Sequence, residues 1–503
     1  MRISARELLE QLLDSDSFVS WDQPPVAVAM SPGYRGDLRK ARDTSGTDEA
    51  VLTGAGLLRG RRVAVVACEF GFLAGSVGVA AAERIVRAVE RATEEGLPLV
   101  ASPTSGGTRM QEGTVAFVQM VKIAGAVAVH KAQGNPYLVY LRNPTMGGVF
   151  ASWGSLGHMT FAEPGALVGF LGPRVYQALY GHPFPEGVQT AENLYRSGVI
   201  DGVLPVSVFR RIAHRALSVC SGAALPGSGS VGNGASSPTV AQSLSSDGDA
   251  WDSVVVSRRP ERPGTRDLLR HVTQRVPLSG TGQGESDRTV VLALARLRGQ
   301  PCVVFGHDRS GQSGEHTMGP AALREARRSM ALAQELRLPL VLVIDTVGAA
   351  LSKEAEERGL APEIARCIAD LVTLETPTVS VLLGQGTGGG ALALLPADRV
   401  LAATHGWLAP LPPEGASAIV HRDTDRAPEL ARAQRIRAAD LFADGIVDRI
   451  VPELPDAADE PVDFARRMVA AIADELVALR ALPEAELLAT RTARYRRVGL
   501  PGG

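Results

Sequence analysis

Adjacent glycines at the ends of short apolar runs are the residues of this chain whose type and spacing best suit a catalytic site. Ser105-Gly106-Gly107 and Gly147-Gly148 lie in the first half, and Gly388-Gly389-Gly390 lies in the second. Glycine has no Cβ, so a ligand can approach the main chain closely, and a free backbone N–H there can stabilise a developing negative charge. An ordinary turn explains any single pair as well or better, so the arrangement of the pairs matters more than their presence.

The same landmarks recur in the second half at a constant spacing. They are Pro98, Pro136, Gly147 and Gly148, and adding 241 to these positions gives Pro339, Pro377, Gly388 and Gly389. Each proline opens a short aliphatic or β-branched run that ends in a polar or Gly turn, which is typical of a strand followed by a turn and a helix. A duplicated unit of this kind offers backbone N–H groups to negative charge at two places. The pattern therefore indicates an enzyme that handles two oxyanions.

The second-half turn also matches a nucleotide-binding motif. Gly384, Gly386 and Gly389 fit the spacing G-x-G-x-x-G, but no acidic residue ends a following strand at the usual distance of about 20 residues. The alternative is a second oxyanion turn, in which Gly389 and Gly390 precede a helix that begins near Ala391. The duplication favours this alternative, because the first-half pair occupies the same place without the motif.

Other reactive side chains give weaker signals. Arg109, just after the first Gly pair, would meet a phosphate or be a surface cation, and Asp345, which ends a buried run, would be catalytic or, as is commoner, cap the next turn. No His spacing suits a metal, no Ser lies in a G-x-S-x-G elbow, and the four cysteines form no C-x-x-C pair. Metal and triad chemistry therefore have no support, and we expect no bound metal.

The composition is that of a globular protein without a polyelectrolyte partner. The 503 residues are 45% hydrophobic and 21% charged, with a formal net charge of −2. This balance gives no sign of a surface that binds nucleic acid or an anionic membrane. The N-terminus shows no signal peptide, and no uninterrupted apolar run approaches the roughly 20 residues needed to span a bilayer. We expect a cytoplasmic protein.

Strands alternate with helices in both halves, which predicts an α/β fold with parallel sheets covered by helices. The expected helices include 77–95, 113–133, 321–336, 364–374 and a final helix at 464–482, and the expected strands include 62–68, 97–101, 137–141, 340–344 and 378–383. A stretch rich in Gly, Ser, Ala and Pro separates the halves and cannot build a core. We therefore expect a first domain at 1–220, a flexible linker at 221–250 and a second domain at 251–503, whose first residues, 251–265, pack irregularly.

Longer strings around these turns resemble the carboxyltransferase component of biotin-dependent acyl-CoA carboxylases. Residues 54–205 are similar to the bacterial acetyl-CoA carboxylase β subunit, and residues 266–452 are similar to its α subunit. The matching strings are ACEFGFLAGSVG, SGGTRMQEG, NPTMGGVFAS and AEPGALVGFLGPRV in the first half, and LPLVLVIDTVGA, GQGTGGGALAL, PPEGASAIV and ADGIVDRIVPE in the second. Several long strings in the right order make the resemblance specific over roughly three quarters of the chain.

The resemblance implies two crotonase-type domains, one β-like and one α-like, fused in one chain. It also implies transfer of a carboxyl group from carboxybiotin, carried on a separate protein, to the α-carbon of an acyl-CoA. By position, Gly106 and Gly107 match the donors for the thioester enolate, and Gly389, Gly390 and Ala391 match those for the biotin carbonyl. The residues expected to bind substrate around them are Ser105, Thr108, Arg109, Met146, Gly147, Gly148, Gly388 and Ala391. Because the family's site lies at a dimer interface, a homodimer or larger homo-oligomer is implied.

Three features depart from the family pattern. The β subunit's four-Cys zinc ribbon is missing. Val347 stands where many relatives have a proline after Asp-Thr, so the neighbouring loop is expected to differ. The chain lacks the biotinyl Met-Lys-Met motif, since Met120-Val121-Lys122 falls in a helical stretch. A separate biotin carboxyl carrier protein and a biotin carboxylase are therefore implied as partners.

Two alternative functions stay open. A decarboxylase of acyl-CoA or malonyl thioesters in the same superfamily would use the same two oxyanion holes. A non-catalytic scaffold subunit of a carboxylase would keep the fold without the chemistry. The intact Gly pairs in both halves argue against the scaffold, because a scaffold does not need two backbone anion sites.

Overall fold

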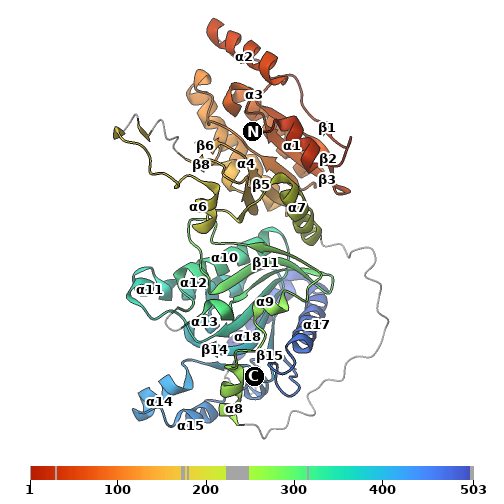
Figure 1. The fold of residues 1–503 in the computed structure, drawn as a ribbon. Coiled ribbons are helices and arrows are strands. Elements are labelled where there is room, and N and C mark those ends of the chain that lie inside the picture. The colour runs from red at the N-terminus through yellow and green to blue at the C-terminus, as the bar shows by residue number, and fades with distance from the viewer. Residues whose placement is uncertain are drawn as a thin grey trace. The chain divides into compact units, whose positions relative to one another are not determined.

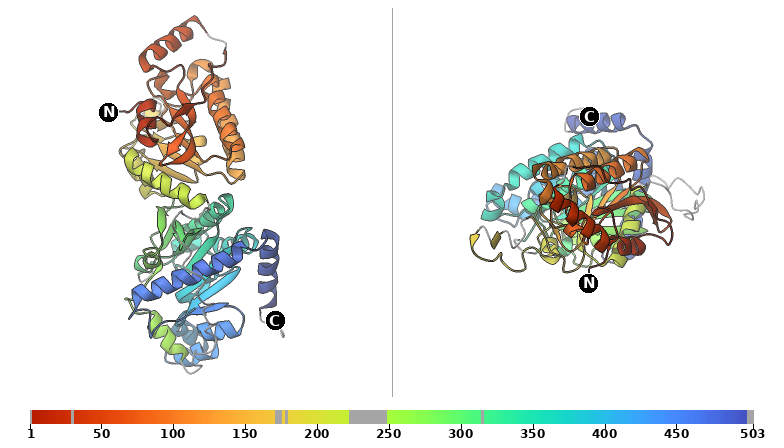
Figure 2. Two further views of the ribbon diagram at one scale, coloured as in Figure 1. Left: turned by 90° about the vertical axis from the view of Figure 1, so that its right-hand side faces the viewer. Right: turned by 90° about the horizontal axis from the view of Figure 1, so that it is seen from above.

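The computed structural model describes residues 2–28, 31–170, 176–177, 180–221, 249–313 and 316–498. Helices and strands alternate along the chain (Figures 1 and 2). The chain divides into two compact units: unit 1 comprises Met1–Ser218 and Gly282–Glu285, and unit 2 comprises Val219–Thr281 and Ser286–Gly503. Most of the expected linker, residues 222–248, lies outside the described residues.

Unit 1 is built on a seven-stranded sheet in the order β1-β2-β3-β4-β5-β7-β9. The β1–β2 and β2–β3 pairs are antiparallel, and the others are parallel, as predicted from the alternation of strands and helices. A short parallel pair, β6 with β8, lies beside the sheet. The strands are β1 Val19–Ser20, β2 Val51–Leu58, β3 Arg61–Cys68, β4 Leu99–Ser102, β5 Tyr137–Leu141, β6 Thr145–Met146, β7 Met159–Ala162, β8 Val168–Gly169 and β9 Gly202–Val203.

Two long helices of unit 1 were expected from the sequence. Helix α3, Val79–Glu94, and helix α4, Thr114–Ala132, confirm the predicted helices within two residues at each end. Ala and branched aliphatic residues on one face of α3 are buried in a core with β3, β4 and β5. The other helices are α1 Ala5–Leu12, α2 Pro32–Ser45, α6 Ala191–Arg196 and α7 Val206–Cys220, with 3-10 turns at Leu73–Gly75, Met110–Glu112 and Trp153–Ser155.

Unit 2 repeats the plan with the order β10-β11-β12-β13-β14-β15-β17, and β16 pairs with β14. The pairs from β12 onward are parallel. The strands are β10 Gln274–Leu278, β11 Val290–Leu297, β12 Gln300–His307, β13 Leu340–Thr346, β14 Thr378–Thr387, β15 Arg399–Ala403, β16 Trp407–Ala409 and β17 Arg449–Val451. The helices are α8 Ala250–Ser257, α9 Thr265–Leu268, α10 Pro320–Glu335, α11 Lys353–Glu357, α12 Leu360–Thr373, α13 Gly388–Leu392, α14 Pro413–His421, α15 Ala427–Ala433, α16 Ala438–Ala443, α17 Pro461–Arg480 and α18 Glu484–Arg497, with a 3-10 turn at Arg309–Gly311.

Two expectations for unit 2 are wrong. The segment after the linker is irregular only at residues 258–264, because α8 forms before them with an Asp249 N-cap and packs Ala250 and Val254 beside Trp407. The helix predicted at 464–482 is α17, but α18 follows it. The side chain of Arg491 in α18 is fully buried, and its Nη2 donates to Asp398 Oδ2 at 2.7 Å. A helix held by a buried arginine lacks the apolar stripe that reveals most surface helices.

The strand registers prove the duplication at the level of backbone pairing. Leu99 pairs with Tyr137 in unit 1, and Leu340 pairs with Thr378 in unit 2, which is the same pair after a shift of 241. The antiparallel hairpins correspond as well, here after a shift of 239, with Val51 opposite Cys68 and Val290 opposite His307. The repeated strand–turn–helix unit predicted from the spacing of prolines and glycines is therefore confirmed.

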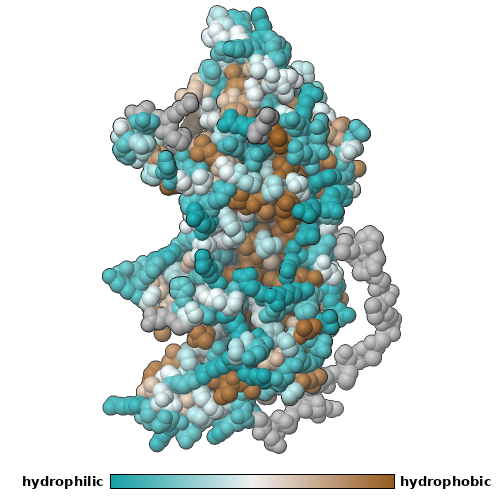
Figure 3. Space-filling model, viewed as in Figure 1, coloured by the Kyte–Doolittle hydropathy of each residue, from teal (hydrophilic) through white to brown (hydrophobic). Residues whose placement is uncertain are grey.

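Helix α4 of unit 1 is unusually apolar on the surface. It is 19 residues long and, among the described residues, the one helix with the length and composition to cross a membrane, which for a single helix is weak evidence. Gln119 and Lys122 interrupt its apolar run. The apolar side chains of α4 that are more than half exposed are Val115, Phe117, Val118, Val121 and Val129. On the face of the molecule shown in Figure 3, apolar side chains likewise gather in patches among hydrophilic ones.

Candidate active site in each unit

The first Gly pair lies in a tight turn after β4, which we call turn A and define as Ser105–Thr108. The Oγ of Ser105 accepts a hydrogen bond from the N–H of Gly107 at 3.0 Å. Gly107 has φ +119°, a conformation that residues with a Cβ rarely adopt. The glycine at 107 is therefore required by the shape of the turn.

The free donor of turn A differs from the predicted one. The N–H of Gly106 donates to the carbonyl of Ala74 at 2.9 Å, so Gly106 does not offer it to a ligand. On either side, the N–H of Val77 donates to Gly107 O, and the N–H of Arg109 donates to Val77 O. They leave the N–H of Thr108 without an acceptor among the described residues. The donor of this turn is thus Thr108, which the sequence placed only among substrate-binding residues.

A second turn of unit 1 lies against the first. It comprises Met146–Gly148 at the end of β6, and the N–H of Met146 donates to Ser105 O at 2.9 Å. Gly147 has φ +63°, and its N–H is bonded to Gly169 O at 3.0 Å. The N–H of Gly148 has no acceptor in the described part of the chain. A Cβ on Gly148 would lie 3.3 Å from Thr108 Oγ1, so the two free N–H groups belong to adjacent residues in space.

Arg109 does not contribute to this surface, which corrects its expected role in substrate binding. Its side chain is completely buried. Nη1 lies 3.0 Å from Glu49 Oε2, and Nη2 donates to Ser76 O at 2.7 Å. A guanidinium enclosed in this way stabilises the packing of Glu49 and Ser76 next to turn A and cannot reach a phosphate. Its partner Glu49 lies 60 positions away, so no local signal could reveal the pair.

Unit 2 contains the same turn after β13, Thr346–Ala349. The Oγ1 of Thr346 accepts from the N–H of Gly348 at 3.1 Å, and Gly348 has φ +133°. The N–H of Ala350 donates to Met318 O at 2.9 Å, as Arg109 does to Val77 in unit 1. The N–H of Ala349 has no acceptor among residues that the structure describes. Val347, expected to alter this loop, is exposed and leaves these hydrogen bonds in place.

The second Gly cluster begins helix α13. Gly388 has φ +61°, matching Gly147, and starts the helix after Thr387. Gly389 and Gly390 lie in the first turn, where N–H groups have no partner inside a helix. A Cβ on Gly390 would lie 3.3 Å from the Ala349 nitrogen. The start of α13 and the turn after β13 are therefore packed together as in unit 1.

The remaining residues of the second cluster have packing roles. Ala391 is fully buried. Gly384 and Gly386 lie within β14, where a Cβ would stand 2.5 Å from Asp345 Oδ1 and 2.6 Å from Trp407 O. These glycines permit close contact between protein groups, and the dinucleotide-binding interpretation does not hold. Among the described residues, no group of three or more His, Cys, Asp or Glu could hold a metal ion.

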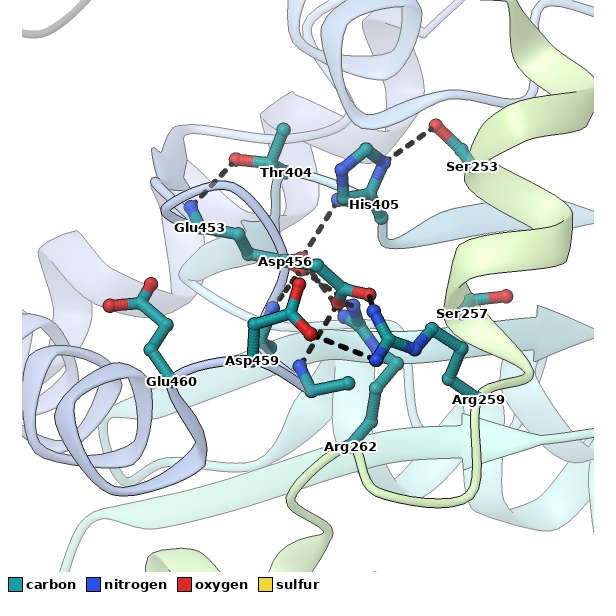
Figure 4. Close-up of polar contacts among 12 residues, drawn as sticks. Ser253, Ser257, Arg259, Arg262, Thr404, His405, Glu453, Asp456, Asp459 and Glu460 are labelled. Carbon is teal, nitrogen blue, oxygen red and sulfur yellow. Dashed lines mark hydrogen bonds and ion pairs between the residues drawn. The ribbon is translucent and has the colours of Figure 1, made fainter.

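A buried ion-pair cluster supports unit 2 beside the site (Figure 4). Arg262 is buried and binds Glu453 at 2.5 Å and Asp456 at 2.6 Å. Arg259 pairs with Asp456 at 2.7 Å and with Asp459 at 2.8 Å. Because these partners are distant in sequence, the cluster anchors the segment between α8 and α9 to the loop between β17 and α17. The sequence alone gave no signal for it.

Comparison with known proteins places the chain in a family. The carboxyl transferase domain family matches residues 2–486, and the chain belongs to that family. A relative from Mycobacterium tuberculosis (strain ATCC 25618 / H37Rv), described as a probable biotin-dependent acyl-coenzyme A carboxylase beta3 subunit, is 64% identical over 501 residues and covers 99% of both chains. A relative from Salinispora arenicola (strain CNS-205), described as acetyl-coenzyme A carboxylase carboxyl transferase subunits beta/alpha, is 38% identical, covering 99% of this chain and 91% of its own.

Solved structures agree at the level of the fold. Transcarboxylase 12S, a hexamer with methylmalonyl-coenzyme A and methylmalonic acid bound, has a TM-score of 0.74 at 20% identity and covers 96% of this chain and 91% of its own. A single-chain, multi-domain long-chain acyl-CoA carboxylase has a TM-score of 0.68 at 19% identity, covering 92% of this chain and 46% of its own. The predicted crotonase-type α/β fold and the enzyme class, a carboxyltransferase of biotin-dependent acyl-CoA carboxylases, are confirmed.

Proposed function

We propose that the protein transfers a carboxyl group from carboxybiotin, presented by a separate carrier protein, to the α-carbon of acetyl-CoA or another short-chain acyl-CoA. The observation that carries the proposal is the repetition of one arrangement in both units. Each unit brings a turn after one strand against a Gly turn after the next, with free main-chain N–H groups at both. A carboxyl transfer of this kind creates two oxyanions, one on each substrate.

Unit 1 would hold the acyl-CoA thioester. Its carbonyl oxygen would accept hydrogen bonds from the N–H groups of Thr108 and Gly148, and the same bonds would strengthen when loss of the α-proton moves charge onto that oxygen. Donors that bind the charged form better than the neutral carbonyl lower the barrier directly. Removal of one such donor typically costs about 3 kcal/mol of transition-state stabilisation.

Unit 2 would hold the ureido carbonyl of biotin. The N–H groups of Ala349, Gly389 and Gly390 fit such an oxygen, because no Cβ covers Gly389 or Gly390. The Oγ1 of Thr387, immediately before α13, is buried without a hydrogen-bond partner in the described part of the chain, which suits a polar ligand nearby. Carboxybiotin, when bound, supplies the carboxyl group and, after releasing it, the base for the α-proton.

The proposal includes a homo-oligomer in which unit 1 of one protomer faces unit 2 of another. The support is the apolar face of α4, which would be costly to leave in water. We expect Val121→Asp, at a side chain that is 72% exposed, to reduce the species seen by size-exclusion chromatography with light scattering to monomers. The matched control is Gln119→Asp on the same helix. An unchanged mass for Val121→Asp would contradict this interface.

The activity is tested through the reverse reaction. Purified protein is incubated with malonyl-CoA and biocytin, and acetyl-CoA formation is followed together with a panel of other carboxyacyl-CoAs. Acetyl-CoA formed only with biocytin supports the proposal. Acetyl-CoA formed without biocytin would indicate a decarboxylase, and no turnover of any carboxyacyl-CoA by the folded protein would indicate a scaffold.

A further inference from the structure

Strands β13 and β14 of unit 2 lose their regular pairing just before the site. Ile344 pairs with Leu382, and the next pair is Thr346 with Gly386. One residue of β13, Asp345, therefore faces three residues of β14, 383–385. An irregularity of this kind redirects the strand that carries the extra residues, and here that strand leads directly into α13.

The carboxylate of Asp345 fills the space that this irregularity creates. Its Oδ1 accepts the N–H of Gln385 at 3.1 Å, and a Cβ on Gly384 would stand 2.5 Å from the same oxygen. Its Oδ2 lies 3.0 Å from Arg309 Nη1, and the residue is only 3% exposed. The carboxylate thus accepts the N–H of Gln385, one of the three residues of β14 that face Asp345.

Unit 1 contains a corresponding irregularity, because Ala101 pairs with Val139 and the next pair is Ser105 with Thr145, but its hydrogen-bond chemistry is the opposite. Thr104 stands at the position of Asp345, and Pro144, which has no N–H, stands at the position of Gln385. Here the Oγ1 of Thr104 donates to the carbonyls of Asn143 at 3.3 Å and Pro144 at 3.2 Å. In unit 1 the side chain that faces the extra residues, Thr104, donates to their carbonyls. In unit 2 the corresponding side chain, Asp345, accepts from an N–H.

Arg309 connects this carboxylate to a further segment of unit 2. Its Nη2 donates to Ser257 O and to Arg259 O, both at 2.9 Å. Burial raises the pKa of Asp345, and the guanidinium of Arg309 acts against that rise. The ion pair therefore offsets part of the cost of burying this carboxylate.

We propose that Asp345 is a positioning residue for the biotin-side donors: by closing the irregularity in β14 with Arg309 as its counter-ion, it sets the direction in which Gly388–Gly390 enter α13. It touches no substrate and acts through the main chain of residues 384–387. This inference rests on the proposed function of unit 2 and adds to it a residue that the neighbouring glycines depend on.

The experiment compares Asp345→Ala with Asp345→Asn in the full-length protein. Alanine removes the acceptor and the charge, whereas asparagine keeps an oxygen for the Gln385 N–H. In biocytin-dependent decarboxylation of malonyl-CoA we expect kcat to fall about 30-fold or more for alanine and about 5-fold for asparagine, with the KM for malonyl-CoA unchanged. The matched variant in unit 1, Thr104→Val, should instead alter the malonyl-CoA kinetics.

Amide hydrogen exchange gives a readout that does not depend on activity. Exchange at residues 385–387 should accelerate in Asp345→Ala, beginning with the Gln385 amide that loses its acceptor, and remain at the wild-type rate at residues 145–147. Wild-type kinetics and exchange in a folded Asp345→Ala variant would overturn the positioning role. An inactive wild-type protein whose variant still shows the local change in exchange would overturn the proposed function and leave the structural role of Asp345 in place.

Discussion

The turns of unit 1 and unit 2 share a backbone and differ in most side chains. Ser105 is matched by Thr346, and Thr108 is matched by Ala349, yet the hydroxyl-to-N–H bond inside the turn is 3.0 Å in one and 3.1 Å in the other. Glycine is kept in both units where φ is positive, as in Gly107 and Gly348. The comparison teaches that turn geometry constrains these positions and that the exposed side chains between them are free to vary.

The two units differ in what supports the turns from behind. Unit 1 uses a completely buried pair, Arg109 with Glu49, whereas unit 2 uses Asp345 with the partly exposed Arg309. The start of the second turn also differs, because Val149 stands in unit 1 where Gly390 approaches Ala349 in unit 2. Two donors therefore correspond in the two units, Thr108 with Ala349 and Gly148 with Gly389, but the groups around them differ.

The largest effect is expected from the buried pair of unit 1. Arg109→Met leaves Glu49 buried and unpaired, so we expect the free energy of unfolding to fall by about 3–5 kcal/mol, measured by urea denaturation. The control Arg87→Met removes an exposed pair with Glu83 and should cost less than about 1 kcal/mol. A stable Arg109→Met protein with a raised KM for acyl-CoA would restore Arg109 as a ligand-binding residue.

The next largest effect separates the two donor sites. A Cβ on Gly389 would stand 2.6 Å from Ile364 Cδ1, so Gly389→Val must displace its surroundings at the start of α13. We expect kcat of the biocytin-dependent reaction to fall about 10²- to 10³-fold, as for the loss of one oxyanion donor. Gly148→Val should produce a similar loss from the acyl-CoA side, and Gly36→Ala, which has open space around it, should be silent. Normal turnover by a folded Gly389→Val variant would contradict the role of the Gly389 N–H as an oxyanion donor.

The two units are expected to differ in how pH affects their stability, because of one pair of equivalent residues in helices α3 and α10. Arg84 of α3 pairs with Asp48 at 2.9 Å, whereas the equivalent residue of α10 is Glu325, whose pKa burial raises to about 8. The folded state keeps a proton that the unfolded chain loses above about pH 4.5, so this contribution to stability is present below that pH and declines as the pH rises to about 8. The slope reaches about 1.4 kcal/mol per pH unit for one group.

Urea denaturation between pH 5 and 8 checks this expectation. Glu325→Gln should remove that part of the pH dependence and leave the rest of the profile unchanged. An identical pH profile for wild type and variant would show that the Glu325 carboxyl ionises alike in the folded and unfolded states.

The smallest effect is expected at Val347, the counterpart of Gly106. Since Val347 is exposed and the turn keeps its hydrogen bonds, Val347→Gly should change kcat by less than about 3-fold and stability by less than about 1 kcal/mol. Steady-state kinetics and thermal unfolding measure both. A gain in kcat of tenfold or more would mean that valine holds the turn in a less active shape.

Spacing and local pattern predicted the frame of the molecule well. Constant intervals between prolines and glycines predicted the duplicated strand–turn–helix unit, because backbone turns have local sequence requirements. The choice among neighbouring N–H groups could not be predicted, since Gly106 is excluded by the carbonyl of Ala74, 32 positions earlier. The sequence assigned Arg109 the wrong role and gave no indication of Arg491. In both cases the arginine is buried because it pairs with an acidic residue far away in the sequence, which no local pattern reveals.

The free N–H groups at both sites belong to the main chain, and this has a genetic consequence. A point mutation can delete a reactive side chain outright, but no substitution except proline removes a backbone N–H. If these N–H groups are the catalytic hydrogen-bond donors of the enzyme, single-residue changes at Thr108 or Ala349 would seldom abolish activity. Most inactivating changes would then map to the residues that hold the turns in place, such as Gly107, Gly348 and Asp345.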